Sequence, residues 1–138
     1  MNAYLDSSVL LRILLSQPDP VREFSRYSQK IASSLVEVEC LRTLDRMRVT
    51  GEMTEEQNAS FRNALFQSME AMEIIQPTPI LLRRASGPFP VALGTLDAIH
   101  LSTAIAWRDE TGSDLTLATH DKSLARAAQA LGFKTEGA

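Results

Sequence analysis

The sequence contains a single cysteine, Cys40, and this scarcity excludes two common sources of structural support. One cysteine cannot form an internal disulfide, and it cannot supply the thiolates of a cysteine-based zinc site. The chain also lacks an apolar run long enough to span a bilayer, and its first residues lack the basic and apolar segments of a signal peptide. We therefore expect a protein of the reducing cytoplasm that does not enter a membrane.

Positive charge is scarce as well. The 14 Lys and Arg residues are outnumbered by 17 Asp and Glu residues, which gives a net charge of -3. A protein that holds nucleic acid in a plain basic groove usually has the opposite sign. Any role with nucleic acid must therefore depend on a local basic patch or on bound cations.

The composition that remains is that of a folded domain. The chain has 138 residues, of which 44% are hydrophobic and 22% charged, close to the average for globular proteins. No repeat, low-complexity segment or linker interrupts it, so we expect residues 1–138 to form one domain with a buried core. A glycine-rich loop that ends in lysine is absent, which excludes a P-loop nucleotide-binding protein.

Strand and helix patterns alternate along the chain. Buried strands are predicted at 2–5, 30–34, 72–76 and 115–118, with an edge strand at 133–135. Helices are predicted at 7–15, 20–29, from 35 to just before Gly51, and at 54–70, 79–86, 95–111 and 122–132. This alternation predicts an α/β fold with a central, mostly parallel sheet of four to five short strands flanked by helices.

The helix that begins at 35 carries two finer predictions. Ser33 or Ser34 precedes it and is expected to cap its first turn. Its apolar residues at 35, 38, 41 and 44 follow helical spacing and are expected to form the buried face.

Four acidic residues occupy comparable places next to these elements. Asp6 directly follows the first strand, and Asp121 follows the strand at 115–118. Asp97 lies in the first turn of the apolar helix, and Glu39 lies inside the helix after the second strand. Because functional groups in parallel sheets gather beyond the carboxyl ends of the strands, we expect these side chains to converge on one edge.

A purely structural interpretation exists for three of these acids. Asp6 has the position of a helix cap, and Asp97 and Asp121 have that of first-turn acids that favour the helix dipole. Glu39 gains nothing from capping, and it interrupts an apolar face. Glu37, two positions away and therefore on a different face of the helix, competes with it for the same assignment.

Four converging carboxylates would repel one another, and a divalent cation relieves that repulsion. Oxygen-only ligands suit magnesium or manganese, which keep several water molecules. Such ions bind a phosphodiester, activate water and stabilise the leaving oxygen. Bound cations would also explain how an acidic protein acts on nucleic acid.

Four stretches of the sequence resemble a known family. The stretches are "YLDSSVLLR", "IASSLVEVECLRTLDR", "LGTLDAIHLSTAI" and "LTLATHDKSLARAAQALG". Together they resemble the PIN-domain nucleases, and more closely the VapC-type toxins of bacterial toxin–antitoxin pairs. They occur in the family's order over nearly the whole chain, and "TLDAIHLSTA" is the most specific of them.

The resemblance implies a three-layer PIN-like fold and a metal-dependent endoribonuclease that uses Mg²⁺ or Mn²⁺. It implies an RNA substrate, a cognate antitoxin encoded nearby and a homodimer. Its catalytic acids fall on Asp6, Glu39, Asp97 and Asp121, of which Asp6, Asp97 and Asp121 would bind the metal. Ser7, Arg42 and Thr119 would bind substrate or support the acids, and Glu39 fits the family's spacing after the two serines better than Glu37.

Two other functions compete with this interpretation. A PIN-like domain that only binds would have lost catalysis, which the presence of all four acids disfavours. A response-regulator-like receiver domain needs an acidic pair after its first strand and an aspartate after its middle strand. Asp6 has no acidic neighbour, and "MEIIQPTP" contains no aspartate. His100 is interpreted as a core or acid-supporting residue and His120 as an exposed turn residue.

Overall fold

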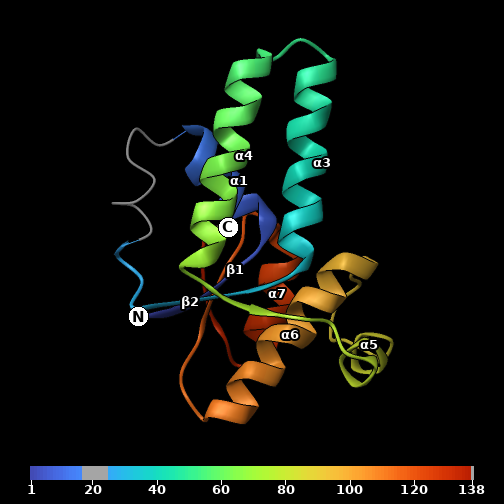
Figure 1. Ribbon diagram of the computed structural model, residues 1–138. Coiled ribbons are helices and arrows are strands. Elements are labelled where there is room, and N and C mark those ends of the chain that lie inside the picture. Colours follow the sequence, from blue (N-terminus) through green and yellow to red (C-terminus); the bar gives the residue numbers. More distant parts are fainter. Residues whose placement is uncertain (17–24, 138) are drawn as a thin grey trace.

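The computed structural model describes residues 1–16 and 25–137 and is built around a five-stranded sheet (Figure 1). Every paired strand runs parallel to its neighbour, and the order across the sheet is β3-β2-β1-β4-β5. The strands are β1 (Asn2–Leu5), β2 (Gln29–Ser33), β3 (Glu73–Ile75), β4 (Thr116–Ala118) and β5 (Lys134–Glu136). The predicted parallel α/β sheet is therefore confirmed, including the edge position of the last strand.

Helices connect the strands and cover both faces of the sheet. They are α1 (Ser7–Ser16), α3 (Leu35–Val49), α4 (Glu55–Glu70), α5 (Pro79–Ala85), α6 (Thr95–Thr111) and α7 (Lys122–Ala130). The start of the helix predicted at 20–29 lies outside the described residues, and its predicted end is wrong because Gln29 already belongs to β2. None of the helices that the structure describes is long and apolar enough to cross a membrane.

Two hydrophobic clusters, one for each face of the sheet, form the core. The first packs β1, β2 and β4 side chains against α1, α3 and α4, and it contains Leu5, Leu10 and Leu65. The second packs the opposite faces of the same strands against α6 and α7, and it contains Tyr4 and Leu117. Alternating side chains of one strand point to opposite faces, which is why neighbours such as Tyr4 and Leu5 divide between the clusters. The three-layer prediction is thus confirmed.

Helix α3 buries a different face from the predicted one. Val36, Cys40 and Leu44 form its buried stripe, spaced by four residues, whereas Val38 is 52% exposed. A residue two positions from a buried one points to the other side of a helix, so Val38 faces away from the sheet. The predicted cap is also altered: Ser34 lies at the N-cap position without a side-chain bond, and the Ser33 hydroxyl accepts from the Leu35 amide instead.

The strand order creates a switch point between the neighbouring strands β1 and β4. From β1 the chain moves outward through β2 and β3, and it then returns to the other side of β1 to form β4 and β5. The carboxyl ends of β1 and β4 therefore flank the switch point of the sheet, where α/β proteins bind their ligands. Asp6 follows β1 there, and its amide donates to the Ala118 carbonyl at the end of β4 at 3.3 Å.

The start of α4 provides a test of local stability away from that edge. The Thr54 hydroxyl accepts from the Gln57 amide at 3.1 Å, and the Gln57 side chain accepts from the Thr54 amide at 2.9 Å. Thr54→Ala removes one half of this capping box and is expected to lower the free energy of unfolding by about 1 kcal/mol. Urea denaturation measures it, with Thr54→Ser as the control that keeps the hydroxyl. An alanine variant as stable as the serine variant would contradict the assignment.

Candidate active site

Asp6 is almost fully buried, at 4% exposure, and the chain around it satisfies both of its carboxylate oxygens. Its Oδ1 accepts from the Ser8 hydroxyl at 2.6 Å and from the Val9 amide at 3.1 Å, which caps α1. Its Oδ2 accepts from the Thr119 hydroxyl, on the turn after β4. The capping interpretation of Asp6 is therefore correct, and it coexists with a position at the switch point of the sheet.

The turn after β4 brings the second acid to the same edge. Thr119 is buried, and its hydroxyl oxygen accepts from the Asp121 amide at 3.0 Å while its hydrogen goes to Asp6. Asp121 Oδ1 in turn accepts from the Leu124 amide at 2.8 Å and caps α7. The Thr119 hydroxyl thus links the Asp6 carboxylate to the Asp121 backbone amide.

Ser8, the neighbour of the predicted Ser7, is the serine that bonds to Asp6 at this edge. Besides donating to Asp6, the Ser8 oxygen accepts from the His120 amide at 3.1 Å and so joins α1 to the turn after β4. Ser7 makes no side-chain hydrogen bond with the part of the chain that is described. A serine two residues after an N-cap aspartate was the signal available, because its hydroxyl can reach back to that carboxylate.

Glu39 and Glu37 point to different surroundings. Glu37 is exposed in the first turn of α3. The Glu39 side chain is only 18% exposed, and its Oε1 lies 2.6 Å from His100 Nε2. The structure therefore places Glu39 on the inner side of α3, next to α6. Arg42 does not join it, since its side chain is 70% exposed and pairs with Asp45 at 3.2 Å.

Asp97 has an environment that differs from that of an ordinary first-turn acid. It is half-buried in the first turn of α6, and α6 has no side-chain hydrogen bond at its cap. Burial raises the pKa of its carboxyl, and the negative charges of Asp121, Asp6 and Glu39 raise it further, while His100 opposes them. The other three acids are thus close enough to Asp97 to contribute to its raised pKa.

The side chains present match a magnesium or manganese site in chemistry. Among the described residues, no three His, Cys, Asp or Glu side chains are arranged to enclose a metal ion. Magnesium needs no such cage, because it is usually held by one or two carboxylates and completes its shell with water and phosphate oxygens. A divalent cation would relieve the repulsion that Asp121, Asp6 and Glu39 exert on the ionised carboxylate of Asp97.

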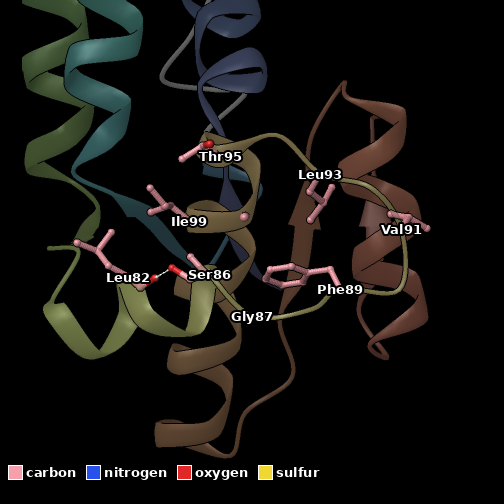
Figure 2. Close-up of a pocket in the computed structure, with 10 residues that line it drawn as sticks. Leu82, Ser86, Gly87, Phe89, Val91, Leu93, Thr95 and Ile99 are labelled. Carbon is pink, nitrogen blue, oxygen red and sulfur yellow. Dashed lines mark hydrogen bonds between the residues drawn. The ribbon is translucent and has the colours of Figure 1, made fainter.

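A hollow of about 450 Å³ adjoins the first turn of α6 (Figure 2). It lies between α5, the segment 86–94 and α6, and Thr95 and Ala98 on its α6 wall flank Asp97 in the sequence. Its wall combines apolar side chains such as Phe89 and Ile99 with polar surface, and Figure 2 shows Phe89 on the segment 86–94 pointing toward α6. We call the edge of the sheet at Asp6 and Asp121, with Asp97 nearby, the acidic edge. The hollow has no carboxylate in its lining, so it adjoins the acidic edge and is not part of it.

Comparison with known proteins supplies independent findings. The sequence model of the PIN domain matches residues 3–130. Ribonuclease VapC46 of Mycobacterium tuberculosis is 31% identical over 134 residues, which cover 94% of this chain and 92% of that protein.

Solved structures resemble the fold over almost its whole length. A toxin–antitoxin complex from Klebsiella pneumoniae contains a chain with a TM-score of 0.68 and 14% identity, covering 99% of this chain and 98% of that one. VapBC2 from Rickettsia felis, bound to a DNA fragment from its promoter, gives a TM-score of 0.67 at 19% identity, with coverage of 99% and 98%. At these identities the likeness establishes a shared fold.

The electrostatic environment of Asp97 predicts how its substitution affects stability. A carboxyl whose pKa is higher in the folded protein than in the unfolded chain stabilises the fold in its protonated form, and this contribution is lost as the pH rises through the folded pKa. Asp97→Asn removes the ionised carboxylate, so at pH 7 in metal-free buffer its melting temperature is expected to equal or exceed that of the wild type. The difference in melting temperature is expected to vanish below about pH 3.8, where Asp97 is protonated in both the folded protein and the unfolded chain.

Thermal unfolding from pH 3.5 to 8 at low salt measures this, since about 0.1 M salt already screens exposed charges beyond roughly 10 Å. Asp114→Asn is the matched control, because Asp114 is exposed and its side chain has no hydrogen bond or ion pair with the described residues. A melting temperature of Asp97→Asn well below the wild type at pH 7 would mean that Asp97 mainly stabilises α6.

Proposed function

Because this chain belongs to the PIN-domain family, we propose that it is a metal-dependent endoribonuclease that hydrolyses RNA phosphodiester bonds and acts as the toxin of a toxin–antitoxin pair. The observations that support the proposal are the positions of Asp6 and Asp121 beyond the carboxyl ends of β1 and β4, and the raised pKa of Asp97, to which Asp121, Asp6 and Glu39 contribute. Carboxylates gathered at a switch point supply the ligands that phosphodiester hydrolysis with magnesium requires.

In this proposal each acid has a role that its surroundings support. Asp6, Asp97 and Asp121 are the metal-binding acids, and Asp6 is the most rigidly held of them, by Ser8, Thr119 and the α1 amide. A bound Mg²⁺ or Mn²⁺ ion would polarise the scissile phosphate and lower the pKa of a bound water molecule. Glu39 has one oxygen engaged by His100, which leaves Oε2 to accept a proton from the attacking water.

Positively charged groups for RNA lie beside the acids. Arg12 is exposed on α1, and its guanidinium Nη1 lies 3.4 Å from the His120 ring. The His120 amide donates to the Ser8 hydroxyl, which donates to Asp6. Through His120 and Ser8 this guanidinium is therefore connected to the Asp6 carboxylate. Arginine suits phosphate contacts because its planar fork binds two oxygens at once. Of the three residues predicted to bind substrate or support the acids, Thr119 is bonded to Asp6, whereas Ser7 and Arg42 have no side-chain bond to these four acids within the described residues.

A toxin of this kind needs an inhibitor in the cytoplasm, where its RNA substrate is found. We expect a cognate antitoxin encoded nearby, with an arginine that enters the acidic edge and displaces metal and substrate together. We also expect a homodimer, for which α5 and the start of α6 offer unburied apolar side chains. Ile80 is 80% exposed, and Leu82 and Leu96 are 43% and 47% exposed.

Cleavage of RNA tests the proposed activity directly. The purified protein, incubated with total bacterial RNA and with defined tRNA, rRNA and mRNA fragments, is expected to cleave at discrete sites with Mg²⁺ and not with a chelator. Asp97→Asn is expected to lower the rate by about 100-fold or more, since it removes a group needed at the reacting centre. Asp114→Asn serves again as the control and is expected to cleave at the wild-type rate. A wild type that leaves every RNA intact with Mg²⁺, or a fully active Asp97→Asn, would contradict the proposal and favour a binding-only domain.

Co-expression tests the antitoxin. Expression of the chain alone is expected to slow bacterial growth, and expression with its small neighbouring gene is expected to restore it and to yield a complex on co-purification. Replacing the inserted arginine of the antitoxin with alanine is expected to restore nuclease activity in the complex, because the charge-assisted bonds to the acids are lost. If the chain alone is harmless and no neighbouring product binds it, the toxin assignment fails even with the fold correct.

A further inference from the structure

Two buried side chains, Tyr4 and His100, and the partly buried side chain of Glu39 form one line of hydrogen bonds across three different elements. The Tyr4 hydroxyl on β1 lies 2.7 Å from His100 Nδ1 on α6, and His100 Nε2 lies 2.6 Å from Glu39 Oε1 on α3. Tyr4 is fully buried and His100 is 1% exposed. The Tyr4 and His100 rings meet edge to face at a centroid distance of 5.9 Å. This line joins the central strand to a helix on each face of the sheet.

The chemistry of the three groups fixes the direction of both bonds. An ionised carboxylate only accepts, so His100 Nε2 must carry a hydrogen and donate it to Glu39. In the neutral imidazole Nδ1 is then an acceptor, and the Tyr4 hydroxyl donates to it. A tyrosine hydroxyl is protonated at neutral pH and is therefore able to donate this hydrogen. Tyr4 therefore selects the His100 tautomer that points an N–H at Glu39.

We propose that His100 is a positioning residue that fixes the Glu39 carboxylate, so that its second oxygen, Oε2, faces the acidic edge at Asp97. Asp97 and His100 lie three residues apart in α6 and hence on the same face of that helix. One face of α6 thus carries both an acid of the site and the group that orients another acid. A glutamate otherwise has three rotatable side-chain bonds, and within the described residues Glu39 has no other side-chain partner.

The inference rests on the proposed nuclease function, and it gives His100 a role beyond filling the core. An apolar residue would fill the same volume without donating to Glu39. Partners of this kind, which hold a functional group by a hydrogen bond, typically change activity by about 10–100-fold when they are lost. The expected loss is in kcat, because the proposed RNA contact at Arg12 lies outside this line of bonds.

A pair of substitutions separates positioning from packing. His100→Leu removes both nitrogens, whereas His100→Gln places an amide N–H near the position of Nε2 and keeps a donor for Glu39. We expect His100→Leu to lower kcat by about 10–100-fold with an unchanged KM for RNA, and His100→Gln to recover to within about threefold of the wild type. Tyr4→Phe, which leaves the imidazole but removes the donor to Nδ1, is expected to fall between them.

Thermal unfolding of each variant keeps the comparison interpretable, and all rates are measured below the lowest melting temperature. Wild-type kcat in a folded His100→Leu variant would overturn the inference. Equal losses in folded His100→Gln and His100→Leu would overturn it as well, because packing alone would then explain the effect.

Nuclear magnetic resonance provides a readout that does not require cleavage. With labelled histidine, His100 Nε2 is expected to be protonated in the wild type. The Glu39 carboxyl carbon, assigned with Glu39→Gln, is expected to shift in His100→Leu and to return toward its wild-type position in His100→Gln. An unprotonated Nε2, or a Glu39 signal insensitive to His100, would overturn the inference. A wild type that shows these signals but cleaves no RNA would instead overturn the proposed function and leave the positioning of Glu39 intact.

Discussion

The buried carboxylate of Asp6 is the group on which the rest of the site depends. It ends the central strand, caps α1 through the Val9 amide and accepts from the Thr119 hydroxyl beyond β4. A buried carboxylate is costly unless its oxygens are satisfied, so the sequence must provide donors from both sides of the switch point. Those donors bring the turn that carries Asp121 to the same edge. The stability of the fold and the assembly of the acids are therefore parts of one arrangement.

The second constraint is electrostatic. In a protein with a net charge of -3, burial raises the pKa of Asp97, and the negative charges of Asp121, Asp6 and Glu39 raise it further by repelling its ionised form. A purely structural acid would be placed to reduce such repulsion, as Asp45 is by its pairs with Arg42 and Arg48. No arginine or lysine of the described residues is paired with Asp97 in this way. In the proposed function, a bound metal ion or an inhibitor's arginine would reduce the repulsion between Asp97 and the neighbouring carboxylates.

Much of the fold followed from the sequence, because its strands and helices have strong and regular signals. The alternation of short apolar runs and helical patterns predicted the parallel sheet, and the boundaries of the predicted strands lie within about a residue of the observed ones. The face of α3 was predicted wrongly, because Val38 and Val36 are equally apolar and only packing against the sheet distinguishes them. The positions of the four acids were also predictable, since each follows a recognisable strand end or helix start. Ser8 was not, because its role depends on a contact with His120, 112 positions away in the chain. His100 was expected in the core or beside an acid, as observed, but its partner Glu39 lies 61 positions away and could not be identified from local pattern.

We propose that Asp6, Asp97 and Asp121 together form one cation site at the switch point of the sheet. Crystals grown with manganese chloride test it most directly, because the anomalous scattering of manganese locates the ion without assumptions about ligands. We expect an anomalous-difference peak between the carboxylates of Asp6 and Asp97, within reach of Asp121. This peak is expected to be lost in Asp97→Asn. Manganese bound only elsewhere, with this edge free of ions at concentrations that saturate the protein, would contradict it.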